Sequence, residues 1–330
     1  MNRRALLAAL ATLIFCVSGC ARLASTRAAT WMIRAPKSVD PRITWTSLRP
    51  SSQRPDAFDQ RFRVEVGPPR ANLLVSTIEP GPGWTPPAGT ILLLHGAYGR
   101  SEDMIPTARA FAANGYRAVL VDMRGHGRST GERITYGVQE SQDLSQVLSF
   151  LERNGLLTGR IGVYGFSFGA AAAIELAGRD PRVGAVVAVA PYSSLHEAAR
   201  HLVRTRIPGA NLFVTDQWID ETVEEAGRQG GFDSRAASPL AAIQRTEAKV
   251  LLIHGDADTF IEPRHSIMLD QATGGRSRIV LVPGADHASL QADETGTAAR
   301  LALSWFNRWM PAAPGRRDVN GRSGCPSRFR

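Results

Sequence analysis

The segment Gly165-Phe166-Ser167-Phe168-Gly169 is a Gly-x-Ser-x-Gly motif whose surroundings indicate its chemistry. An apolar run, IGVYG, precedes the serine, and an alanine-rich run, AAAIELA, follows it. This order predicts a strand, a sharp turn that requires small residues, and a helix, so that the serine hydroxyl is exposed at the N-terminus of the helix. Free N–H groups and the helix dipole favour a developing negative charge there. The structural alternative is a glycine-rich turn with a capping serine.

A serine hydroxyl is a poor nucleophile until a base takes its proton, and an acid must orient that base. The predicted base is His287, which lies in the loop VPGADHASL between the apolar run SRIVLV and the last helical segment. A solvated loop histidine is the alternative interpretation. Four other histidines lack such a loop position: His126, His196, His201 and His265.

The acid is expected in the loop that follows KVLLIHG, which contains Asp256 and Asp258. Asp258 is the predicted acid. Asp256 stays open as the alternative, with a role as a turn residue if it is not the acid. With Asp258 the chain order is Ser167, Asp258 and then His287, which is one of the known orders for such a triad.

Short apolar segments alternate with helical patterns over most of the chain, which predicts an α/β fold with a doubly wound, mostly parallel sheet. RFRVEV and NLLVSTI, separated by Gly67-Pro68-Pro69, predict a hairpin before this alternation begins. Residues 195–246 interrupt the rhythm and predict an inserted helical cap. The last helix is expected from Ser289 to Trp309, because Pro311 ends it.

Residues 1–20 read MNRRALLAALATLIFCVSGC, with two arginines before an apolar run, as in a secretory signal peptide. The run is shorter than the ~20 residues that a membrane-spanning helix needs. Val17-Ser18-Gly19-Cys20 resembles the bacterial lipobox, in which the cysteine becomes the acylated first residue. We therefore expect Cys20 to be lipidated, and the protein to lie in the bacterial cell envelope, at the outer membrane if the source is Gram-negative. A plain secreted or periplasmic protein is the alternative.

The chain has 330 residues, is 43% hydrophobic and carries a formal charge of +9, with three cysteines. Three separated cysteines cannot build a disulfide scaffold, and no Cys/His cluster suits zinc. Residues 21–60 are expected to be a spacer, and residues 311–330 a disordered basic tail. Because the basic residues are spread along the chain, no nucleic-acid partner is expected, and the excess charge favours an anionic membrane surface.

Residues 61–310 resemble the alpha/beta-hydrolase superfamily, most closely its prolyl-oligopeptidase-like and monoglyceride-lipase-like esterase branch. The segments that carry the resemblance are LLLHGAYGRSEDM, VDMRGHGRSTGE, GVYGFSFGAAAAIELA, LLIHGDADTFIEP and PGADHASL. In this branch the acid is the third residue after His-Gly, which is Asp258. Glu262 is a departure, because many relatives carry proline there.

The resemblance implies an oxyanion hole made by the backbone N–H groups of Phe168 and Ala97, with Tyr98 as an alternative second donor. It also implies that His95 packs beneath this loop, and it indicates that Arg124 pairs with Asp122. The cap residues remain open between an apolar acyl site and the cap's own core; they are Leu212, Phe213, Trp218 and Ile219.

The leading interpretation is a membrane-anchored serine hydrolase that cleaves a small or lipid-like carboxylic ester through an acyl-enzyme, without a metal or organic cofactor. A peptidase or amidase of the same fold is the first alternative. A noncatalytic envelope protein that binds a ligand in the cleft is the second.

Overall fold

The computed structural model describes residues 23–36 and 57–310 of the chain. The predicted signal peptide, Cys20 and the predicted basic tail lie outside the described residues. Within the described part, no helix is long and apolar enough to cross a membrane.

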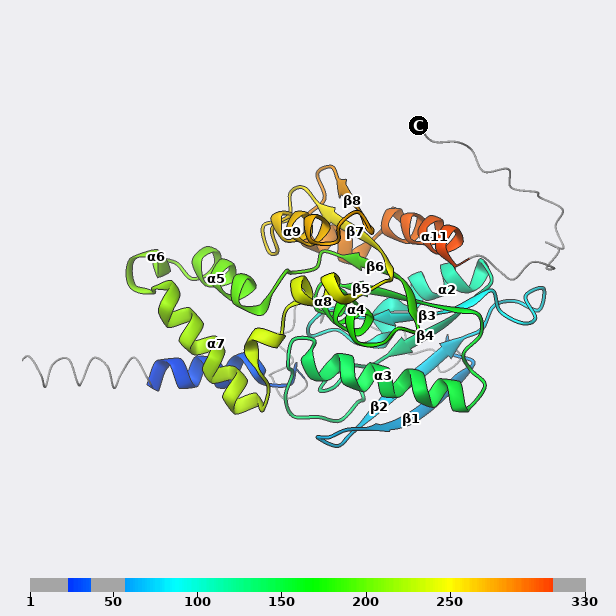
Figure 1. Cartoon of the computed structure of the whole chain (residues 1–330), viewed down its shortest axis with the longest axis horizontal. Coiled ribbons are helices and arrows are strands. Elements are labelled where there is room, and N and C mark those ends of the chain that lie inside the picture. Colours follow the sequence, from blue (N-terminus) through cyan, green and yellow to red (C-terminus); the bar gives the residue numbers. More distant parts are fainter. Residues whose placement is uncertain (1–22, 37–56, 311–330) are drawn as a thin grey trace, which may run out of the picture.

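An eight-stranded sheet with the order β1-β2-β4-β3-β5-β6-β7-β8 forms the centre of the molecule (Figure 1). β1 and β2 form the predicted hairpin, β2 pairs with β4 in antiparallel fashion, and all other pairs are parallel. The predicted doubly wound, mostly parallel sheet is therefore confirmed. The strands are β1 (Gln60–Val66), β2 (Ala71–Ile78), β3 (Gly89–Leu94), β4 (Tyr116–Val121), β5 (Arg160–Phe166), β6 (Val183–Val189), β7 (Lys249–Gly255) and β8 (Ser277–Val282).

Helices cover both faces of this sheet. One face packs against α3 (Val138–Arg153), α4 (Phe168–Arg179), α8 (Pro239–Arg245) and α9 (Arg264–Ala272). The other face packs against α2 (Ile105–Ala113), which follows the short helix η4 (Ser101–Met104), and against α10 (His287–Ala292) and α11 (Thr297–Trp309). The central strands β3 and β5 are buried on both faces, which explains why their sequences are continuous apolar runs.

A helical insertion after β6 forms the predicted cap and has a small core of its own. It contains α5 (Leu195–Arg206), α6 (Ala210–Phe213), α7 (Asp216–Gly230) and η5 (Ser234–Ala236). The two ends of the insertion meet, because the N–H of Leu195 donates to the carbonyl of Ala237 at 2.9 Å. The predicted cap boundary at residue 246 is too late, because α8 packs against α4 of the central sheet region.

Part of the predicted spacer is folded. Residues 23–33 form a helix that packs along α7 (Figure 1). Ala29 and Ile33 are buried against Ala226, and small side chains let the two helices approach closely. The inward face of this helix is short and ends with Met32 and Ile33, so its sequence gives only a brief apolar repeat. Residues 37–56 of the predicted spacer lie outside the described chain.

The predicted helix from Ser289 to Trp309 is two helices. Asp293 has a left-handed backbone (φ 41°) that ends α10, and Gly296 (φ 65°) precedes α11. The carboxylate of Asp293 accepts the N–H groups of Ala298 and Ala299 at 3.0 and 2.9 Å, which satisfies the free donors of the second helix. The break allows α10 to begin at His287.

Candidate active site

Ser167 lies on the turn between β5 and α4 with a backbone conformation that L-residues rarely adopt (φ 52°, ψ −113°). Its N–H donates to the carbonyl of Val189 at 2.7 Å, which holds the turn against β6. A Cβ atom at Gly165 would lie 2.2 Å from the carbonyl oxygen of Gly169, and one at Gly169 would lie 2.3 Å from that of Leu94. The two glycines of the motif are therefore required by the close approach of the backbone.

The structure brings the three predicted triad residues together. The Nε2 atom of His287 lies 3.0 Å from the Oγ atom of Ser167. Its Nδ1 atom lies 2.7 Å from the Oδ2 atom of Asp258. In this arrangement Nδ1–H donates to the carboxylate, and Nε2 is free to accept the serine proton.

The choice between the two aspartates follows from the backbone of the acid loop. Asp258 is 2% exposed, and its Oδ1 atom accepts the N–H groups of Phe260 and Ile261 at 2.8 and 2.9 Å. Asp256 is exposed, and its carboxylate accepts the N–H of Gly284 at 2.7 Å. Asp256 is therefore a turn residue, which is the role expected for it if it is not the acid.

Burial acts to raise the pKa of Asp258, but its contacts with His254 and His287 and the N–H groups of its loop outweigh burial, so the pKa lies well below the usual range. The acid therefore stays ionised and can stabilise an imidazolium. The ring of His287 lies between Phe166 and Phe260, with both ring centroids 4.9 Å away. These contacts restrict the rotation of the imidazole.

The predicted oxyanion donors lie beside the nucleophile. Phe168 is the first residue of α4, so its N–H is one of the four that have no acceptor within a helix. Ala97 follows β3 in the loop that faces this turn. In the described part of the chain, neither N–H donates to a protein acceptor. Tyr98, the alternative donor, has a left-handed backbone (φ 61°).

His95 is buried beneath this loop, as expected. Its Nδ1–H donates to the carbonyl of Gly96 at 2.8 Å, and its Nε2 accepts the N–H of Met123 at 3.1 Å. Burial lowers the pKa of His95, so the neutral ring serves as a fixed bridge between β3 and β4.

His254, which no sequence motif singles out, supports the acid loop. Its Nε2–H donates to the carbonyl of Ile261 at 2.8 Å, and Nε2 lies 3.5 Å from Asp258 Oδ2. His265 has a similar structural role: Ser193 contacts its Nδ1 at 2.9 Å, and burial lowers its pKa to about 4. The segment LLIHG does contain His254, but a histidine inside an apolar strand gives no indication of its partner.

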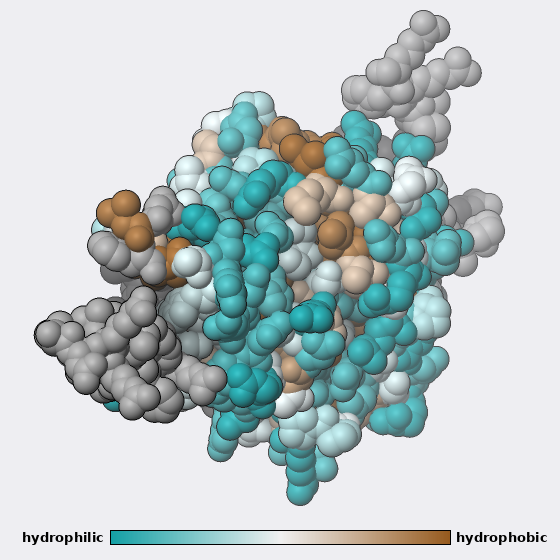
Figure 2. All heavy atoms as spheres, turned by 60° about the vertical axis from the view of Figure 1, so that its left-hand side comes forward, coloured by the Kyte–Doolittle hydropathy of each residue, from teal (hydrophilic) through white to brown (hydrophobic). Residues whose placement is uncertain are grey.

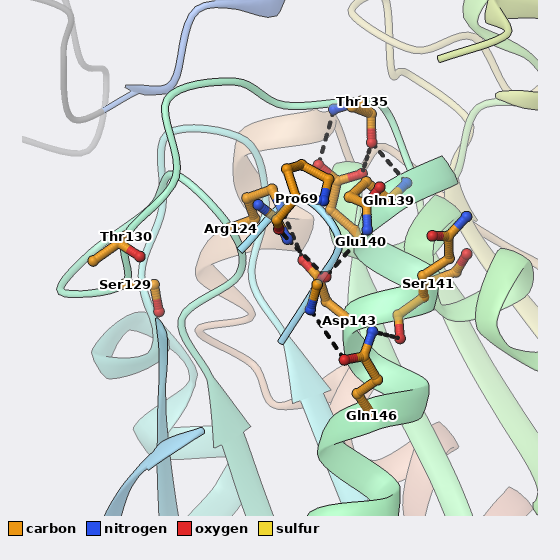
Figure 3. Close-up of polar contacts among 12 residues, drawn as sticks. Pro69, Arg124, Ser129, Thr130, Thr135, Gln139, Glu140, Ser141, Asp143 and Gln146 are labelled. Carbon is orange, nitrogen blue, oxygen red and sulfur yellow. Dashed lines mark hydrogen bonds and ion pairs between the residues drawn. The ribbon is translucent and has the colours of Figure 1, made fainter. Parts of the chain in front are cut away.

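The predicted pair between Arg124 and Asp122 is wrong. Arg124 forms a buried, two-pronged ion pair with Asp143 of α3, with N···O distances of 2.7 and 2.8 Å (Figure 3). Asp122 instead accepts the N–H groups of Ser101 and Arg128 at 2.6 and 2.8 Å. Asp122 thus holds two loop segments together, because its carboxylate already accepts a backbone N–H from each of them.

The apolar cap residues do not gather at the nucleophile. Ile219 is buried in the core of the cap, and Trp218 is partly buried against that core. Leu212 is 79% exposed on α6. The side chain of Phe213 lies outside the described part of the structure. The core interpretation therefore holds for Ile219 and Trp218.

Comparison with known proteins agrees with this geometry. The family model for X-Pro dipeptidyl-peptidase (S15 family) matches residues 71–206, which include Ser167 and make up less than half of the chain. The Bacillus subtilis (strain 168) protein YqkD is 29% identical over 204 residues, which cover 60% of this chain and 65% of that protein, just under two thirds of its length.

Two solved structures share the fold at low sequence identity. An esterase from Pyrococcus furiosus has a TM-score of 0.58 and 21% identity, and the match covers 77% of this chain and 92% of that chain. The acylaminoacyl peptidase of Pyrococcus horikoshii has a TM-score of 0.58 and 18% identity, covering 86% of this chain and 46% of that chain. The chain therefore has the alpha/beta-hydrolase fold of these two structures, and its described part places a serine, a histidine and an aspartate in hydrogen-bond contact.

Proposed function

We propose that the protein hydrolyses a carboxylic ester through an acyl-enzyme and is held at a membrane by an acylated Cys20. The observation that carries the catalytic part is the pair of distances at His287, 3.0 Å to the Ser167 hydroxyl and 2.7 Å to the Asp258 carboxylate. The carboxylate orients the imidazole through Nδ1, and Nε2 is in position to accept the serine proton. Acyl transfer needs this arrangement.

In the first half-reaction, Ser167 Oγ attacks the carbonyl carbon of the ester while its proton moves to Nε2 of His287. The backbone N–H groups of Phe168 and Ala97 stabilise the resulting oxyanion, and the N-terminus of α4 adds its positive end. His287 then gives the proton to the departing alcohol, which leaves an acyl-enzyme. In the second half-reaction, His287 deprotonates a water that attacks the acyl carbonyl, and Ser167 regains its proton as the acid leaves.

An ester is favoured over an amide by the extent of the structural match. The likeness to the Pyrococcus furiosus esterase covers almost all of that chain, whereas the likeness to the acylaminoacyl peptidase covers less than half of it. The match to a peptidase family model over residues 71–206 keeps the peptidase or amidase as the second candidate.

A fluorophosphonate probe tests the catalytic proposal, because it reacts with an activated serine. The wild-type protein is expected to be labelled, and Ser167→Ala is expected to take up no label. A series of p-nitrophenyl esters beside aminoacyl p-nitroanilides then separates the two candidates. Hydrolysis of anilides without esters would favour the peptidase, and absence of labelling in monodisperse protein would favour a noncatalytic binding protein.

The anchoring part is supported by the helix at residues 23–33. This helix runs parallel to α7, because Ser25 contacts Thr222 at 3.2 Å and Thr30 contacts Gln229 at 2.7 Å. Its first residues therefore lie beside the N-terminal half of α7. Leu23, three positions after Cys20, is 58% exposed at this end.

An acylated Cys20 would thus bring the cap toward the bilayer. The exposed apolar residues of the adjoining cap segment are Leu212 and Ile207, 79% and 52% exposed. Figure 2 brings this end of the molecule forward, and apolar side chains stand out at its left margin. A lipid surface is a suitable partner for such residues beside an acyl anchor.

Cell fractionation tests the anchor. The wild-type protein is expected in the membrane fraction, and Cys20→Ser is expected to move it to the soluble fraction. Cys16→Ser is the matched control, because this cysteine precedes the proposed cleavage site and should not affect anchoring. Wild-type protein in the soluble fraction would contradict the anchor and leave the catalytic proposal intact.

A further inference from the structure

A hollow of about 580 Å³ lies beside the triad, between the cap and the acid loop. The cap contributes the C-terminal part of α5, and the hydrolase body contributes the segment that runs from Asp258 to Arg264. The hollow therefore lies between the cap and the loop that holds the proposed catalytic acid. Its lining carries five ionisable groups: His201, Arg206, Asp258, Glu262 and Arg264.

Most of these groups already have partners. Glu262 pairs with Arg264 at 2.5 Å and lies 3.5 Å from Nδ1 of His201. His201 also donates from Nε2 to the carbonyl of Thr259 at 3.1 Å. Asp258 is occupied by the triad and by its own loop. The hydrogen-bonding groups of these side chains are therefore largely occupied, and Arg264 balances the charge of Glu262.

Arg206 differs from them. It is exposed on the last turn of α5, and within the described residues its guanidinium forms no ion pair with a carboxylate. The guanidinium lies over the ring of Phe260, with its carbon 5.3 Å from the ring centroid. Stacking on an aromatic face leaves the N–H groups at the edge of the guanidinium free to bind an anion.

Phe260 connects this cation to the reaction centre. The ring is 40% exposed, and its centroid lies 4.9 Å from that of His287. A substrate whose carbonyl is at Ser167 must pass this part of the surface if one of its arms extends under the cap. An anionic group on that arm would then reach Arg206 over the exposed Phe260 ring.

We propose that this hollow is a subsite for a carboxylate carried by the substrate, and that Arg206 is its binding residue. The inference rests on the proposed ester hydrolysis and names the substrate class: half-esters of dicarboxylic acids, or esters of hydroxy acids. The planar guanidinium suits a carboxylate because two parallel N–H···O bonds can form. In the same lining, Arg264 offsets the charge of Glu262, which reduces its repulsion of an anion.

Matched esters test the subsite. For a charge on the acyl side, mono-p-nitrophenyl adipate is compared with its methyl ester. For a charge on the alcohol side, the butyrate ester of 4-hydroxybenzoate is compared with that of methyl 4-hydroxybenzoate. The measured quantity is the ratio of kcat/KM for the anionic ester to kcat/KM for the neutral one, in wild-type protein and in Arg206→Gln.

The ratio is expected to fall about tenfold or more in Arg206→Gln for one of the two pairs, chiefly through KM, because a charge-assisted pair is lost. The pair that responds identifies the side that carries the anion. Arg206→Lys is expected to give an intermediate ratio, since it keeps the charge and loses the planar fork. Arg204→Gln, which removes a positive charge from the same helix, is expected to keep the wild-type ratio because Arg204 already pairs with Asp216 at 2.6 Å.

An unchanged ratio in Arg206→Gln for both pairs, in protein that still hydrolyses the neutral esters, would contradict the subsite and leave the proposed function standing. An equal fall in Arg204→Gln would also contradict it, because the effect would then come from the general charge of α5. Wild-type protein that hydrolyses none of the four esters and takes up no fluorophosphonate would overturn the proposed function, and the subsite with it.

Discussion

The backbone N–H of Ser238, at the base of the cap, donates at 2.8 Å to the buried carboxylate of Glu175 on α4. Burial raises the pKa of this carboxyl to about 7, although the contact with Ser238 and the charges of Arg245 and Arg179 act to lower it. The side chain thus connects the cap to the helix that carries the nucleophile, and it titrates near neutral pH.

This relationship predicts a pH-dependent stability. The unfolded carboxyl loses its proton near pH 4.5 and the folded one near pH 7, so the contribution of Glu175 is fully present below pH 4.5 and is lost as the pH rises through 7. The loss amounts to about 3 kcal/mol. Glu175→Gln should therefore gain stability relative to wild type between pH 4 and pH 8, as measured by urea denaturation. The same difference at both pH values would contradict this prediction.

The conformation of Ser167 predicts an unusual effect of glycine. Because φ is 52° at this position, alanine is strained there and glycine is not. Ser167→Gly should be more stable than Ser167→Ala by about 1 kcal/mol, and both should be inactive. Ser149, within α3, provides the control: there alanine should be the more stable replacement. The same order at both positions would contradict the strain at Ser167.

The acid loop predicts a clear contrast between its two aspartates. Asp258→Asn should lower kcat by about four orders of magnitude, because the amide no longer favours the tautomer that leaves Nε2 free. Asp256→Asn should retain activity of the wild-type order, since this carboxylate is exposed and accepts the N–H of Gly284 in a turn. Steady-state kinetics on one p-nitrophenyl ester measures both, and circular dichroism checks that each variant is folded. Comparable losses would contradict the assignment.

The ion pair between Arg124 and Asp143 predicts a large effect on stability. Both side chains are buried, so Arg124→Met alone leaves an unpaired carboxylate and should cost about 3–5 kcal/mol. The double variant Arg124→Met/Asp143→Leu should recover most of this loss. Arg70→Met, which breaks the exposed pair with Glu65, should change stability by less than about 1 kcal/mol. A double variant as unstable as the single one would contradict the explanation.

The triad and the order of the elements could be predicted from the sequence because their signals are local. The Gly-x-Ser-x-Gly turn needs glycine two positions before and two positions after the serine, and most strands and helices of the sheet region show an apolar run or a helical period. The sequence predicts Asp258 as the acid and the resemblance supports it, but Asp256 stays open because two aspartates in one loop have the same side chain. The backbone N–H groups of Phe260 and Ile261 select Asp258.

Other features were decided by tertiary structure alone, because they join residues that are distant in the chain. Arg124 pairs with a residue of the following helix rather than with its near neighbour Asp122. The helix at residues 23–33 buries Ala29 and Ile33 against Ala226 of α7, a contact between segments that lie far apart in the chain. Arg206 becomes an anion-binding candidate only because folding places it over Phe260 and leaves it without a carboxylate in the described chain. Sequence determined the chemistry of the site, and long-range packing decided what surrounds it.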